Sequence, residues 1–82
     1  MLIYPNPVES NTTLEYTLQN EDIISIELMD LNGKIIKTFI ANEKRFAGKH
    51  EQIITLPSHL DPGNYIIHVS SASGQMGLKI TH

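Results

Sequence analysis

Histidine has the widest chemical repertoire of the residue types in this sequence, because imidazole binds metal ions and transfers protons near neutral pH. The four histidines occupy positions 50, 59, 68 and 82, and no two of them form an HxxH or HxxxH pair. His50, His59 and His68 fall in different predicted elements, so a shared metal site is not expected. The sequence has no cysteine, which excludes disulfides, thiol catalysis and cysteine-ligated zinc.

Other chemically suggestive groupings have the wrong geometry or lack essential members. Ser58, His59 and Asp61 are the residue types of a catalytic triad, but their adjacency in one turn prevents the required alignment. Residues 30–33 (Asp-Leu-Asn-Gly) are similar to a fragment of a calcium-binding loop that lacks the remaining ligands and the terminal Glu. The five glycines are isolated and form no phosphate-binding loop. We therefore expect no catalytic residue, no metal site and no cofactor.

Tyrosines could form a platform for stacking on sugars. Tyr16 and Tyr65, however, alternate with polar residues on the apolar face of their segments, which predicts that both are in the core. The five Phe and Tyr residues hardly supply the exposed row of aromatic side chains that a sugar-binding face needs.

Length and charge restrict the partners. A chain of 82 residues forms one small domain, residues 1–82. Six Lys and Arg against nine Asp and Glu give a net charge of −3, which argues against binding to nucleic acids or anionic membranes. No apolar run approaches the ~20 residues of a membrane span, so direct membrane insertion is not expected.

The elements that must position these residues are strands. Apolar and polar residues alternate with period 2 in most segments, and none carries an apolar stripe at helical spacing. The expected strands are residues 2–4, 12–18, 24–29, 34–40, 51–56, 65–70 and 76–81. About seven strands at this spacing predict an all-β fold, an antiparallel immunoglobulin-like β-sandwich.

Alternation also predicts the core. The expected core residues are Leu14, Tyr16, Ile26, Leu28, Ile54, Tyr65, Ile67 and Val69. In the last strand, Met76, Leu78 and Ile80 are expected to point inward. The segments 34–40 and 51–56 carry apolar residues on both faces, so they are either central strands or edge strands that need covering.

Turn residues separate these strands. Residues 30–33, 61–64 and 71–74 are predicted tight turns, in which Gly33 and Gly63 supply the backbone freedom. A longer polar loop is expected at residues 42–48. Pro5 and Pro7 are expected to keep the first strand short.

The order of these turn motifs is informative. Along the chain it runs Tyr4-Pro5-Asn6-Pro7, then Asp30-Leu31-Asn32-Gly33-Lys34, then Ala47-Gly48-Lys49-His50, then Leu60-Asp61-Pro62-Gly63-Asn64-Tyr65. Each motif is weak alone, but this series resembles the type A C-terminal sorting domain of the type IX secretion system (Por secretion system) of Gram-negative bacteria. The resemblance covers residues 3–80.

Such a resemblance implies a non-catalytic sorting domain at the end of a larger secreted protein. It implies three partners: the outer-membrane translocon, a shuttle protein and a sortase-like peptidase. It also implies transit through the periplasm to the cell surface or the extracellular space. The alternatives are an immunoglobulin-like spacer and a carbohydrate-binding module of a surface enzyme.

The C-terminal hairpin, residues 60–82, is the predicted recognition surface. The resemblance places the export signal in the last two strands, and the terminal strand is accessible to a partner's strand. The candidate recognition residues are Gly63, Tyr65, Gly77, Lys79 and Thr81. Lys79 is the single lysine of the last strand, where family members often carry two or more.

Overall fold

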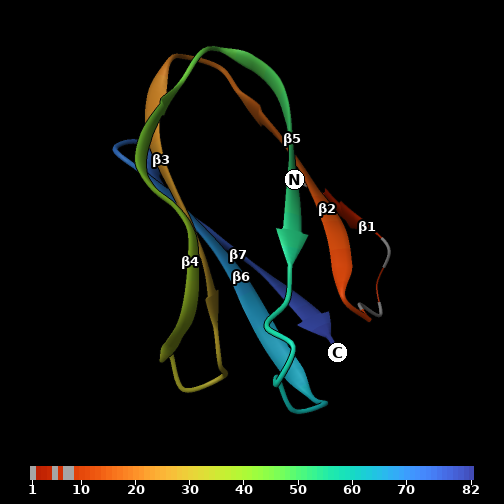
Figure 1. Ribbon diagram of the computed structural model, residues 1–82. Coiled ribbons are helices and arrows are strands. Elements are labelled where there is room, and N and C mark those ends of the chain that lie inside the picture. Colours follow the sequence, from red (N-terminus) through yellow and green to blue (C-terminus); the bar gives the residue numbers. More distant parts are fainter. Residues whose placement is uncertain (1, 5, 7–8) are drawn as a thin grey trace.

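Seven strands make up the fold. The structure is a computed structural model that describes residues 2–4, 6 and 9–82 (Figure 1). The strands are β1 (Leu2–Tyr4), β2 (Asn11–Leu18), β3 (Asp22–Met29), β4 (Ile35–Arg45), β5 (Gly48–Thr55), β6 (Asn64–Ser71) and β7 (Gly74–Thr81). The described residues form no helix, and the predicted all-β fold is confirmed.

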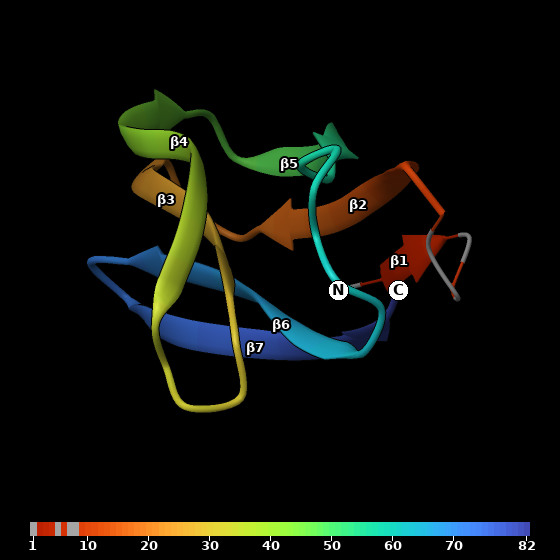
Figure 2. The same cartoon turned by 60° about the horizontal axis from the view of Figure 1, so that its bottom comes forward.

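Two antiparallel sheets pack face to face as a sandwich. One has the strand order β1-β2-β5 and the other the order β4-β3-β6-β7. Figure 2 shows the first sheet above β6 and β7 of the second. The chain changes sheet after β2, after β4 and after β5. This arrangement confirms the immunoglobulin-like sandwich.

The core lies between the two sheets. It consists of Leu14, Tyr16, Ile24, Ile26, Leu28, Ile40, Ile54, Leu56, Tyr65, Ile67 and Ile80. The predicted core is confirmed except for Val69, which packs against this cluster but is only partly buried. Val69 lies beside an open cleft at one end of the sandwich, where it has less covering protein.

Strand β4 is longer than predicted. It runs to Arg45, so the polar loop expected at residues 42–48 is wrong, and only two residues separate β4 from β5. Asn42 has a φ of +51°, and its backbone N–H donates to Ser25 Oγ at 3.0 Å. This bulge re-aims the strand, and the polar residues beyond it pair with the start of β3. Strand pairing thus overrides the weak strand propensity of the segment.

The two segments with apolar residues on both faces are edge strands. These are β4 in the four-stranded sheet and β5 in the three-stranded sheet. Ile40 and Ile54 are buried, whereas Ile35 and Ile53 are 51 % and 61 % exposed. Of the two alternatives for these segments, the edge position is confirmed.

Candidate functional site: the β6–β7 hairpin

The start of β6 is fixed by Tyr65. Its ring is buried, and its hydroxyl donates to the carbonyl oxygen of Asp61 at 2.5 Å. A tyrosine bonded to backbone a few residues upstream is the tyrosine corner of immunoglobulin-like sandwiches. This bond accounts for the spacing of the Leu60-x-x-Gly63-x-Tyr65 motif, since the phenol spans the turn containing Gly63.

Gly63 bonds to His82 at the open end of the hairpin, opposite the β6–β7 turn. Its φ of +153° lies in a region that side chains disfavour. Its N–H donates to the His82 carbonyl at 3.2 Å, and its carbonyl accepts the His82 N–H at 2.8 Å. This reciprocal pair extends the β6–β7 ladder beyond Asn64 and Thr81.

The other side of β7 is a free sheet edge. Strand β7 ends its sheet and pairs only with β6 among the strands of the structure. In an antiparallel ladder, residues next to a reciprocally bonded pair direct their N–H and C=O groups away from the neighbouring strand. From the Gly63–His82 pair and the regular register, the outward-directed backbone groups belong to Gln75, Gly77, Lys79 and Thr81. Figure 2 shows β7 at the margin of its sheet.

Asn6 closes one end of this edge. Its side-chain carbonyl accepts the Thr81 backbone N–H at 3.2 Å. Thr81 Oγ1 in turn donates to Asn64 Oδ1 at 3.1 Å. The first and last family motifs therefore meet in space; Pro5 and Pro7 of the first lie outside the described residues.

The outward side of β7 carries three of the predicted recognition residues. Gly77, Lys79 and Thr81 are exposed. Lys79 has no ion pair with any residue of the described ranges. A Cβ atom added at Gly77 would lie 3.1 Å from Ile66 Cγ2, so glycine at this position lets the Ile66 side chain lean across the β7 backbone.

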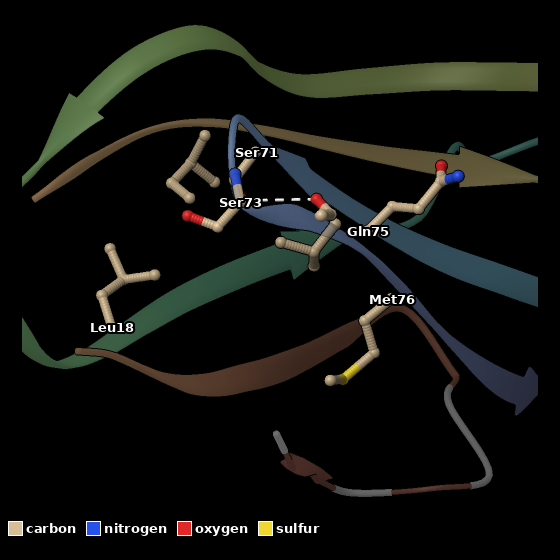
Figure 3. A pocket seen from close by; sticks show the side chains of 8 residues that line it. Leu18, Ser71, Ser73, Gln75 and Met76 are labelled. Atoms are coloured by element: carbon tan, nitrogen blue, oxygen red, sulfur yellow. Dashed lines mark hydrogen bonds between the residues drawn. The ribbon is translucent and has the colours of Figure 1, made fainter. Parts of the chain in front are cut away.

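On the inward side, the first part of β7 borders a cleft of about 280 Å³. Leu18, Val69 and Met76 are among its lining residues, and Figure 3 shows Leu18 and Met76 at its two sides. Met76 lies on the inner face of β7 as predicted, but it borders this cleft outside the core and is 55 % exposed. The cleft lies beside Leu18, three residues beyond the part of β2 that pairs with the described residues of β1. Leu78 is half-buried and Ile80 fully buried, as expected for inward positions.

Asp22 ties the β6–β7 turn to β3. Its carboxylate accepts the Ser73 hydroxyl at 2.6 Å and the backbone N–H groups of Ala72 at 3.2 Å and Ile23 at 2.8 Å. These bonds, that from Ser73 above all, hold the pKa of Asp22 below its usual range. Sequence reasoning missed this residue because it lies 51 positions from Ser73.

The middle family motifs lie elsewhere and shape other turns. Asp30 Oδ1 accepts the backbone N–H groups of Asn32 and Lys34, each at 2.9 Å, and Gly33 has a φ of +87°. The predicted hairpin turn is confirmed, between β3 and β4. Gly48, with a φ of +121°, begins β5.

The histidines are dispersed. The His50 ring stacks on Tyr16 with 5.3 Å between ring centroids, whereas His68 Nε2 lies 2.9 Å from Gln75 Oε1 on the other sheet. Within residues 2–4, 6 and 9–82, no three His, Cys, Asp or Glu side chains are grouped as metal ligands. No helix long and apolar enough to cross a membrane occurs in the same ranges.

Comparison with known proteins identifies a family. A model of the family described as "Secretion system C-terminal sorting domain" matches residues 2–81. No curated protein and no solved structure matches the chain.

Proposed function

The chain belongs to the family of type IX secretion system C-terminal sorting domains, and we propose that it directs a larger cargo protein across the outer membrane for attachment to the cell surface or for release. The family is one of sorting signals that act with the type IX machinery. Under the proposal, residues 1–82 are the terminal domain of that cargo protein and pass through the periplasm before export.

Three partners follow from the proposal. The outer-membrane translocon and the shuttle protein would recognise the folded domain. The sortase-like peptidase would cut the chain upstream of β1 and would supply its own catalytic residues. The domain would then contribute its shape and its backbone hydrogen-bonding groups to recognition, and no catalytic residues.

The free edge of β7 is the observation that carries this proposal. A receptor can bind such an edge by adding a strand, using main-chain hydrogen bonds that depend little on side chains. Gly63, Tyr65 and Asn6 hold the open end of the hairpin, where β6 begins and β7 ends. Asp22 holds the β6–β7 turn at the other end through Ala72 and Ser73. The exposed Gly77 and Lys79 lie between these two ends.

Export of a reporter fused to this domain tests the proposal in a type IX-competent host. We expect Lys79→Glu to reduce the exported fraction while leaving the melting temperature unchanged, because a surface substitution shifts stability by less than about 0.5 kcal/mol. Lys44→Glu is the charge-reversal control, since Lys44 is an exposed lysine on the opposite edge of the same sheet. Lys44 forms an ion pair with Glu21 at 3.2 Å, but both side chains are exposed, so this pair contributes little to stability.

Equal export by Lys79→Glu and by a chain ending at Ser73 would contradict the proposal. That result would favour the immunoglobulin-like spacer. The carbohydrate-binding alternative gains no support from the tyrosines, because Tyr16 and Tyr65 are in the core as predicted.

A further inference from the structure

We propose that the occupant of the β7 edge is an extended segment of a partner protein that pairs antiparallel with residues 75–79 and carries the pattern acidic–x–aromatic–apolar. This inference rests on the proposed function, because it names the chemistry of the partner that binds the same hairpin. Three independent features of β7 define the pattern.

The free backbone groups of β7 favour an extended strand as the occupant of this edge. The N–H and C=O groups of Gln75, Gly77 and Lys79 point away from β6 and form a ladder of regular register. A partner strand can satisfy all of them, whereas a side chain or a small ligand can reach only one or two. Asn6 already accepts the Thr81 N–H, so the added strand ends at Lys79. The remainder of the sheet is antiparallel, and antiparallel pairing is slightly more stable per residue.

Gly77 selects the aromatic residue. It has no side chain, so nothing at this position stands between Ile66 and the free edge. A large ring on the partner residue opposite Gly77 can lie across the glycine and contact Ile66. Such cross-strand covering of an edge glycine by an aromatic ring stabilises sheets.

Lys79 selects the acidic residue. Side chains two positions apart on a strand share one face, so Lys79 and Gly77 both point outward. Lys79 is exposed and forms no ion pair within the part of the chain that the structure describes. A carboxylate directly opposite it in the added strand forms a cross-strand ion pair. In antiparallel order this acidic residue precedes the aromatic one by two positions.

The cleft selects the apolar residue. Met76 points to the inner face, where it borders the open cleft with Val69 and Leu18 (Figure 3). The partner residue opposite Met76 follows the aromatic one and faces the same side. An apolar side chain there covers the exposed Met76 and enters the cleft, which removes apolar surface from water.

Peptide binding to the ¹⁵N-labelled chain tests the proposal. The probe is a blocked peptide, Thr-Glu-Thr-Phe-Leu-Thr-Thr, and the readouts are NMR shifts and exchange rates of the backbone amides. We expect shifts along β7 and slowed exchange of the Gly77 and Lys79 amides. Lys79→Glu should weaken binding by about fivefold, the upper range for an exposed ion pair. A peptide with Lys in place of Glu should restore binding to this variant, whereas Lys44→Glu should bind the original peptide normally.

Three results would overturn the inference. The first is that the original peptide and a peptide with the Phe and Glu positions exchanged bind equally well. The second is that the NMR shifts of the backbone amides are confined to β4 or β5. The third is a concentration-dependent dimer of the chain joined through β7. The last would identify a second copy of the chain as the occupant. The reporter assay measures export directly and therefore tests the proposed function separately. If the peptide does not bind but export still depends on Lys79, this inference is wrong and the proposed function stands.

Discussion

Truncating Ile67 to alanine tests whether the sandwich core holds the recognition hairpin in place. Ile67 is fully buried in the middle of β6, and its neighbours across the sheet are Leu28 on β3 and Leu78 on β7. The substitution removes three carbon atoms, worth about 2.4 kcal/mol of transfer free energy at ~0.8 kcal/mol each. The remaining cavity adds to this loss, so we expect destabilisation of about 2–5 kcal/mol.

That loss is large for a domain of this size. At about 0.05–0.15 kcal/mol per residue, a chain of 82 residues has an unfolding free energy of about 4–12 kcal/mol. Ile67→Ala should therefore lower the melting temperature by about 8 °C or more. Urea denaturation followed by circular dichroism measures the free energy directly, provided that the slope m is unchanged.

Ile53→Ala is the matched control. Ile53 is also in a strand and loses the same atoms, but it is 61 % exposed. Its substitution should cost no more than about 1 kcal/mol, mainly through strand propensity. The burial argument would be refuted if Ile67→Ala cost less than about 1 kcal/mol, or no more than Ile53→Ala.

Further predictions concern the hairpin and its support. Gly63→Val should destabilise the domain by about 1–3 kcal/mol, because valine disfavours a φ of +153°, and should reduce export of a fused reporter; unchanged melting and export would contradict both parts. Tyr65→Phe, which removes the hydrogen bond to Asp61, should cost about 0.5–1.5 kcal/mol in urea denaturation, and a neutral result would show that the ring alone holds the corner. The Asp22 carboxylate, with its pKa lowered chiefly by Ser73, should stabilise the fold fully above its ordinary pKa of 3.8 and lose this contribution as the pH falls through the lower folded value. Melting curves of the parent and Asp22→Asn should therefore differ less in acid than at neutral pH, and a constant difference would contradict this linkage.

Local sequence pattern was sufficient for the tight turns and for most of each strand. The alternation of Leu14 and Tyr16 with polar residues has the period of a half-buried strand, and both side chains are buried. The Asp30 and Gly33 turn was equally predictable, because its hydrogen bonds join residues at most four positions apart. The family motifs also follow from local geometry, as the four-residue reach of Tyr65 to Asp61 illustrates.

Pairing between distant segments decided the rest. Polar residues at the end of β4 became strand only because β3 pairs with them across the Asn42 bulge. Met76 has the alternation of a core residue, yet it borders the open cleft and is 55 % exposed.

The candidate site was likewise predictable from the sequence only in part. The sequence by itself determined its composition: a terminal strand with Gly77, Lys79 and Thr81 on one face, following a turn at Gly63. Only the tertiary structure decided that β7 is an edge strand, that the cleft opens beside it and that Asn6 caps Thr81 from 75 residues away. Alternation reports which face of a strand is buried, but it contains no information about which strand lies beside it.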